Sequence, residues 1–187
     1  SMIRFLLAAF VSLIVIGCVS PKLQNAGKID DSKCDTAAQC NDTGVKYELQ
    51  GNLKAAQKYY ETACDGKIGG ACSNLGSIYQ SKNNKSESEI LAIFLKSCEF
   101  GSKYGCYNAA NLYRLSKTPD YGKALKLYEK SCTLMEHAQS CSNLGGMYQF
   151  SLGIKVADSK TAKKFYKMGC EMGDEIGCRN LSLISNE

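Results

Sequence analysis

Ten of the eleven cysteines in this chain of 187 residues recur as pairs at a regular interval, and this pattern limits the fold more than any other feature. Once Cys18 is set aside, the pairs are Cys34/Cys40, Cys64/Cys72, Cys98/Cys106, Cys132/Cys141 and Cys170/Cys178. Their second members follow one another at intervals of 32, 34, 35 and 37 residues. A period near 34 is typical of a solenoid in which each unit is a pair of helices stacked on its neighbours.

The segments that begin at each second cysteine predict the first helix of each unit. They read CNDTGVKY, CSNLGSIY, CYNAANLY, CSNLGGMY and CRNLSLIS. The third, fourth and seventh positions after the cysteine are mostly apolar, small and tyrosine, and they share one face of a helix with the cysteine. We expect the small residues to permit close contact between helices; they are Gly44, Gly76, Ala110 and Gly145. We expect the tyrosines of this face in the core; they are Tyr47, Tyr79, Tyr113 and Tyr148.

A second helix is predicted before the first cysteine of four of the pairs, where apolar residues recur at helical spacing. Its start signals are a capping box at Ser86 and Glu89, Pro119 at a helix start, and Asp158 as an N-cap. The glycines expected in the turns to the next unit are Gly101, Gly105, Gly173 and Gly177. The chain is therefore predicted to be an all-α array of about four helix pairs and a more polar terminal helix.

Each cysteine spacing places one sulfur at the end of a second helix and the other at the start of the next first helix. These helix ends must lie side by side, so a Cα separation near 5.5 Å, which suits a disulfide, is within reach. Closing a ring of about nine residues stabilises the fold by about 2.5 kcal/mol on the chain-entropy estimate. The alternative is that the cysteines are reduced core residues. The closely spaced pair Cys34/Cys40 has no clear second helix before it.

The N-terminal segment indicates export. Ser1, which precedes Met2, is excluded as an expression remnant, and Arg4 is followed by an apolar run over residues 5–16. The tetrapeptide Val-Ile-Gly-Cys ending at Cys18 resembles the bacterial lipobox, in which the cysteine is lipidated. We expect a signal peptide at 1–17, lipidated Cys18 with a flexible tether at 18–33, and a repeat domain at 34–187. The alternative is a single membrane anchor that is never cleaved.

The repeating motifs resemble those of a known family. They are Asn-Leu-Gly-x-x-Tyr in the first helix, Lys-Ala-x-x-x-Tyr-x-Lys at residues 123–130 in the second, and paired cysteines at each turn. The chain resembles the Sel1-like repeat family, which is TPR-like, and is similar to the Helicobacter cysteine-rich proteins over about residues 33–187. The resemblance implies a right-handed α/α solenoid clamped by disulfides, with a concave face that serves as an adaptor for other proteins. For the cysteine-rich subgroup it also implies β-lactam binding or slow, β-lactamase-like hydrolysis.

One polar position in the first helices is a candidate for ligand binding. The second residue after the cysteine is Asn74, Asn108, Asn143 or Asn180 in four of the units. It lies on the helix face opposite the cysteine stripe, and we expect that face to line the groove. A row of amides supplies both donors and acceptors, which suits a peptide backbone or sugar hydroxyls. The alternative is that these asparagines bond the neighbouring repeat and only stiffen the array.

Catalytic motifs are missing from the sequence. It contains no Ser-x-x-Lys, Lys-Thr-Gly or Gly-x-Ser-x-Gly, and its single histidine, His137, cannot build a metal site or a triad alone. We therefore predict no catalytic residue, no metal and no cofactor, and a weak β-lactam hydrolase or a thiol oxidoreductase remain as alternatives.

A net charge of +5, spread along the chain, argues against nucleic acid as a partner. We expect a monomeric binding scaffold that contacts the membrane through its N-terminal lipid and holds a peptide, a protein or a peptidoglycan fragment. It would be an outer-membrane lipoprotein facing the periplasm, or a secreted or surface protein.

Overall fold

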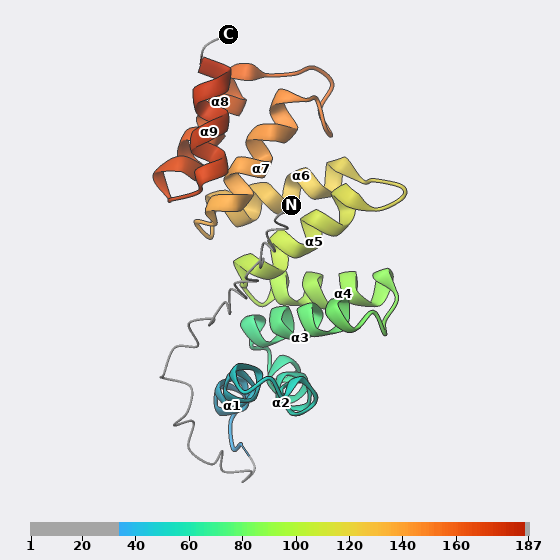
Figure 1. Ribbon diagram of the computed structural model, residues 1–187. Helices are drawn as coiled ribbons and strands as arrows, with labels where there is room; N and C mark the ends of the chain where they lie inside the picture. Colours follow the sequence, from blue (N-terminus) through green and yellow to red (C-terminus); the bar gives the residue numbers. More distant parts are fainter. Residues whose placement is uncertain (1–33, 186–187) are drawn as a thin grey trace, which may run out of the picture.

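Nine α-helices make up residues 34–185, the part of the chain that this computed structural model describes, and no strand occurs in that part. The helices are α1 (Ala37–Leu49), α2 (Leu53–Asp65), α3 (Gly69–Lys82), α4 (Glu87–Glu99), α5 (Lys103–Leu115), α6 (Tyr121–Thr133), α7 (Ala138–Gln149), α8 (Ser159–Glu171) and α9 (Glu175–Ser185). Each helix packs chiefly against its neighbours in the chain, so that helix pairs stack from α1 and α2 at one end to α8 and α9 at the other (Figure 1). The predicted α/α solenoid of four helix pairs and a terminal helix is confirmed.

The predictions for the N-terminal segment lie outside the described residues. These are the signal peptide at 1–17 and lipidated Cys18 with its tether at 18–33. Within the described residues, no helix has the length and apolar character needed to cross a membrane.

Side-chain caps fix where several helices begin. Ser86 and Glu89 form the predicted capping box of α4, and Asp158 caps α8 by accepting a hydrogen bond from the Thr161 amide at 2.9 Å. The predicted helix start at Pro119 is wrong, because Asp120 is the N-cap of α6 and the helix begins at Tyr121. Asp120 accepts a hydrogen bond from the amide of Lys123, which sets this boundary.

Two of the four predicted turn glycines are not in turns. Gly101 and Gly173 have φ of 84° and 92° and form the turns before α5 and α9. Gly105 and Gly177 instead lie inside these two helices. A Cβ at Gly105 would lie 2.3 Å from the Ser97 hydroxyl oxygen, so this glycine is required by the close approach of α4 and α5.

The core is built where a ring from the second helix of a unit rests on a small residue of its first helix. A Cβ at Gly44 would lie 2.7 Å from Tyr60, one at Gly76 would lie 2.6 Å from Phe94, and one at Gly145 would lie 2.7 Å from Tyr166. In the remaining pair, Ala110 and Tyr128 belong to one buried cluster. The four rings are at most 1% exposed; they are Tyr60, Phe94, Tyr128 and Tyr166. Close helix contact through the small residue, as predicted from the sequence, is therefore what the glycines provide.

Disulfides join the ends of consecutive helices at each elbow. Four of them link the last turn of α2, α4, α6 or α8 to the first turn of the following helix; they are Cys64–Cys72, Cys98–Cys106, Cys132–Cys141 and Cys170–Cys178. Their Cα atoms are 4.5 to 4.8 Å apart. The fifth, Cys34–Cys40, ties the chain before α1 to α1 itself. One edge of the solenoid is thus covalently fixed along its length.

Candidate functional site

The asparagines that follow the elbow cysteines meet the buried rings of the preceding unit. The amides of Asn74, Asn143 and Asn180 each interact with the hydroxyl of the tyrosine in the helix before them. These tyrosines are Tyr60, Tyr128 and Tyr166. Burial raises the pKa of all three phenols, and the asparagine acts in the opposite direction because a donor favours the ionised oxygen.

Asn108 is the member of this row that meets a different ring. The residue at the tyrosine position of the preceding helix is Phe94, which has no hydroxyl. Within residues 34–185, the Asn108 side chain forms no hydrogen bond. Its amide is half-buried and lines a cavity.

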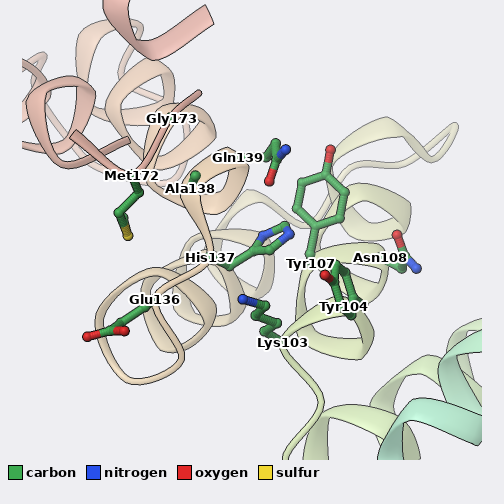
Figure 2. A pocket seen from close by; sticks show the side chains of 10 residues that line it. All are labelled: Lys103, Tyr104, Tyr107, Asn108, Glu136, His137, Ala138, Gln139, Met172 and Gly173. Atoms are coloured by element: carbon green, nitrogen blue, oxygen red, sulfur yellow. The ribbon is translucent and has the colours of Figure 1, made fainter. Parts of the chain in front are cut away.

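This cavity has a volume of about 460 Å³ and opens at the elbow edge of the solenoid, between the start of α5 and the start of α7 (Figure 2). Its lining residues come from α5, the α6–α7 turn, the start of α7 and the α8–α9 turn; they are Lys103, Tyr104, Tyr107, Asn108, Glu136, His137, Ala138, Gln139, Met172 and Gly173. Segments from three successive units therefore share one pocket, and the elbow disulfides hold each of them.

Helix α5 supplies larger side chains to this pocket than α3 and α7 have at the same positions. Lys103 and Tyr104 lie three and two residues before Cys106, and Tyr107 lies one residue after it. The same positions hold Gly69, Gly70 and Ser73 in α3, and Ala138, Gln139 and Ser142 in α7. Aligning the cysteines of α3, α5 and α7 shows this difference in the sequence, although it did not enter the prediction of the site.

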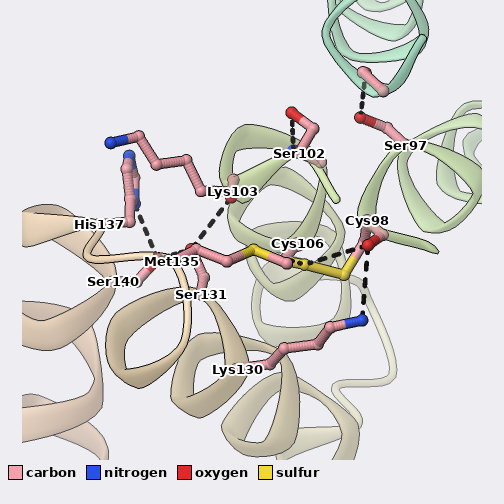
Figure 3. Close-up of a disulfide and its surroundings, with 12 residues drawn as sticks. Ser97, Cys98, Ser102, Lys103, Cys106, Lys130, Ser131, Met135, His137 and Ser140 are labelled. Atoms are coloured by element: carbon pink, nitrogen blue, oxygen red, sulfur yellow. Dashed lines mark hydrogen bonds between the residues drawn. A yellow bond between two sulfur atoms is a disulfide. The ribbon is translucent and has the colours of Figure 1, made fainter. Parts of the chain in front are cut away.

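His137 forms the floor of the pocket and is held by a chain of hydroxyls. The Ser131 hydroxyl donates to the carbonyl of Lys103 at 3.0 Å, and the Ser140 hydroxyl donates to the Ser131 oxygen at 2.9 Å. Ser140 Oγ lies 2.9 Å from His137 Nδ1 (Figure 3). A carbonyl only accepts, so Ser131 uses its proton in the bond to Lys103, and Ser140 uses its proton in the bond to Ser131. Nδ1 must therefore be the donor in its contact with Ser140. The neutral imidazole therefore carries its proton on Nδ1 and a lone pair on Nε2.

The surroundings keep His137 in this neutral form. The side chain is 5% exposed, and its ring meets the edges or faces of Tyr104 and Tyr107 with centroid distances of 5.3 and 4.8 Å. Burial lowers the pKa of His137, the nearby Lys103 ammonium lowers it further, and Asp174 opposes the shift. Within the described residues, Nε2 has no hydrogen-bond partner and Lys103 has no carboxylate partner.

The contact between His137 and Ser140 does not activate a nucleophile. Ser140 is fully buried, and its proton already points to Ser131. A base must accept the proton of the nucleophile, whereas here Nδ1 is the donor. The geometry supplies recognition groups: a lone-pair acceptor, an ammonium donor, an amide and two tyrosine rings.

A family model described as Sel1 repeat matches residues 35–67, 103–134 and 138–174, which together are more than half of the chain. The chain belongs to the Sel1 repeat family. The second helix pair, α3 and α4, lies between the first two matched segments. It carries Phe94, the ring without a hydroxyl.

Solved structures of other Sel1 repeat proteins have the same fold. A Sel1 repeat protein from Oxalobacter formigenes superposes with a TM-score of 0.69 at 25% identity, covering 78% of this chain and 62% of that one. Helicobacter pylori cysteine rich protein B superposes with a TM-score of 0.55 at 29% identity, covering 70% of this chain and 95% of that one. The similarity to the Helicobacter cysteine-rich proteins expected from the motifs is therefore confirmed.

Curated relatives match a smaller part of the chain. Cytochrome c oxidase assembly factor 7 of Xenopus tropicalis is 27% identical over 117 residues, which is 59% of this chain and 51% of the relative. The human protein of the same name is 28% identical over 112 residues, or 54% of this chain and 48% of the relative. The chain thus spans about half the length of the curated relatives it matches.

Within the Sel1 array, the structure separates the four predicted ligand-binding asparagines. Asn108 lines the pocket, whereas Asn74, Asn143 and Asn180 interact with tyrosine hydroxyls of the preceding unit. Sequence reasoning did not identify the pocket residues contributed by the elbows, His137 above all. Residues 34–185 contain no group of three or more side chains placed to hold a metal ion.

Proposed function

We propose that this Sel1 repeat protein is a non-catalytic binding scaffold that holds an extended peptide segment of a partner protein in the pocket between α5 and α7. The observation that carries the proposal is a pair of polar groups at the floor of an open pocket, His137 Nε2 and the Lys103 ammonium. Among residues 34–185, Nε2 has no hydrogen-bond partner, and the ammonium lies 5.8 Å from the centre of the Tyr104 ring but has no carboxylate partner. Both groups are accessible from the pocket, so a ligand that supplies a donor and an acceptor can form a hydrogen bond with each of them.

The family supports a protein as the partner, because Sel1 repeats typically form protein-binding adaptors. The name of the curated relatives, cytochrome c oxidase assembly factor 7, also supports a protein rather than a small molecule. Of the four asparagines, we assign the ligand to Asn108, and we assign Asn74, Asn143 and Asn180 to the junctions between units. A peptidoglycan fragment is the ligand that the test below must separate from a peptide.

Five disulfides and the similarity to Helicobacter pylori cysteine rich protein B indicate an exported protein. We propose that the exported protein is a monomer anchored to the outer membrane through lipidated Cys18. Residues 1–17 would be removed, and residues 18–33 would form the tether. The lipobox-like tetrapeptide supports this anchor. Mass spectrometry of the unreduced mature protein tests it: we expect a lipidated N-terminal Cys18 and no free thiol, and an unmodified Cys18 would contradict the anchor.

Selection from a library of random linear peptides tests the binding function. The bait is the disulfide-intact protein, and we expect enriched peptides whose binding is lost in Lys103→Met but kept in Lys126→Met. Lys126 is exposed on α6 and does not line the pocket, so it is a matched control. If purified muropeptides bind and no library peptide does, the ligand is a cell-wall fragment and not a peptide segment of a protein. Turnover of a chromogenic β-lactam at ordinary enzyme rates would contradict a non-catalytic role.

A further inference from the structure

We infer that the pocket hydrogen-bonds the main chain of its ligand at one residue. The N–H of that residue donates to His137 Nε2, and its C=O accepts from the Lys103 ammonium. This inference rests on the proposed peptide-binding function and adds the groups that make the contact. Asn108 then bonds the adjoining peptide unit, and the rings of Tyr104 and Tyr107 contact a neighbouring side chain.

The hydroxyl chain determines which kind of ligand group fits His137. Because Nδ1 donates to Ser140, and Ser140 and Ser131 pass their protons toward the Lys103 carbonyl, Nε2 is an acceptor. The Lys103 side chain reaches the same side of the imidazole, as Figures 2 and 3 both show. The floor of the pocket thus presents one acceptor beside one donor.

An extended peptide presents the complementary pair. In a β-type main chain, the N–H and C=O of a single residue point to the same side, as in the residue pairs of an antiparallel ladder that exchange two hydrogen bonds. A carboxylate would place two acceptors on this floor, one of them against the lone pair of Nε2. A main-chain residue satisfies both groups without a change of protonation.

Asn108 is available to the ligand because of a ring in the preceding unit. In three junctions the equivalent asparagine interacts with a tyrosine hydroxyl, but Phe94 offers none. Asn108 and Phe94 belong to different sides of the junction, and Phe94 does not line the pocket. A change at Phe94 can therefore redirect Asn108 without altering the pocket wall.

The only histidine of the chain gives a direct spectroscopic test. We expect nitrogen NMR of the disulfide-intact protein to show the neutral Nδ1–H form of His137 at neutral pH. The capped tripeptide acetyl-Ala-Phe-Ala-amide should shift the Nε2 resonance in the direction of hydrogen-bond acceptance. The same tripeptide methylated at the phenylalanine nitrogen should bind about tenfold more weakly, the effect of one lost hydrogen bond.

Variants separate this inference from the function on which it rests. Lys103→Met should weaken tripeptide binding about tenfold, whereas Lys126→Met should leave it unchanged. Asn108→Ala and Phe94→Tyr should each weaken it, the second by giving Asn108 a hydroxyl partner. If library peptides bind but leave the His137 resonance unshifted, the inference is wrong and the scaffold function stands. If neither library peptides nor the tripeptide binds, both are wrong.

The dependence of binding on pH distinguishes a main-chain ligand from a carboxylate. The groups facing His137 are Lys103, Tyr104 and Tyr107 on α5, Glu136 beside it, and Asp174 before α9. Between about pH 8 and about pH 5, histidine is the side chain that ordinarily changes charge. Protonation turns Nε2 into a donor, so tripeptide affinity should fall on the acid side of this range. Affinity that rises with acid would overturn the inference in favour of a carboxylate ligand.

Discussion

The α8–α9 and α4–α5 junctions place an aromatic ring and an asparagine at equivalent positions, but only the first ring carries a hydroxyl. In the α8–α9 junction, the Tyr166 hydroxyl donates to Gln149 at 2.7 Å and interacts with the Asn180 amide. In the α4–α5 junction, Phe94 fills the same space and Asn108 turns to the pocket. The difference of one oxygen atom shows how a repeat protein obtains a binding group: an amide that the array does not use is left for a ligand.

The largest effect is expected from removing the disulfide that holds the α7 side of the pocket. The double variant Cys132→Ala, Cys141→Ala should lower the free energy of unfolding by about 2.5 kcal/mol, because the elbow ring no longer restricts the unfolded chain. Urea denaturation measures this change. The variant lacking Cys34–Cys40, at the far end, is the control and should keep tripeptide binding. Equal pocket binding in both variants would contradict a role for the α6–α7 elbow.

The next effect comes from converting the α8–α9 junction into the α4–α5 type. Tyr166→Phe should lower the free energy of unfolding by about 1 to 1.5 kcal/mol, because Gln149 and Asn180 lose a shared partner. The control is Tyr121→Phe, since the Tyr121 hydroxyl forms no hydrogen bond within residues 34–185 and should change stability by less than about 0.5 kcal/mol. Equal urea midpoints for the two variants would show that the hydroxyl does not stabilise the junction.

The reverse conversion should have a smaller effect of opposite sign. Phe94→Tyr should raise the free energy of unfolding by up to about 1 kcal/mol, because its hydroxyl gains Asn108 and Gln80, the counterpart of Gln149. Thermal unfolding and the side-chain amide signals of Asn108 measure it. A clear loss of stability would mean that the junction has no room for the hydroxyl and that the two junctions are not interchangeable.

The smallest effect concerns the starts of α4 and α7. Like the two junctions, they differ in whether a polar group has a hydrogen-bond partner, because α4 has a side-chain cap and α7 has none. The Ser86 amide donates to the Glu89 carboxylate, and this bond, with help from the Ser86 hydroxyl and Lys85, lowers the pKa of Glu89 to about 2. The folded pKa is below the ordinary value of 4.5, so this stabilisation is present above that pH and is lost as pH falls toward 2. Carboxyl NMR titration checks the value, and Glu89→Gln should abolish the acid dependence.

Helix α7 provides the contrast to α4, because its N-cap, His137, forms no side-chain cap hydrogen bond. Its first amides should exchange with solvent faster than those of α4 at neutral pH. Equal protection of the two helix starts would show that the capping box adds nothing local.

Local sequence patterns predicted most of the fold. The signals were the period of the cysteines, the apolar face after each second cysteine and the capping box at Ser86. Each of them acts over fewer than ten residues or repeats along the chain, so all units predict the same structure. The errors at Pro119 and Gly105 also have a local origin. A competing cap at Asp120 and the close approach of Ser97 override the usual meaning of proline and glycine.

The candidate site was predicted less completely. The asparagine row was visible in the sequence, but its division into three junction contacts and one pocket group depends on rings that lie in the preceding helix. His137 was recognised as unable to form a metal site alone, yet its partners Ser131 and Ser140 and its neighbour Lys103 could not be assigned. Their contacts depend on how one unit rotates against the next.

The sequence by itself determined the helix pairs, their number and the elbow cysteines, because these follow from periodicity and from spacings that a single turn must close. Only the tertiary structure decided where a ligand can bind. Lys103, His137 and Met172 come from three successive units, and stacking of those units brings them to one pocket. The physical reason is that a helical repeat fixes the chemistry of each position locally, whereas the partner of each side chain is set by packing between units.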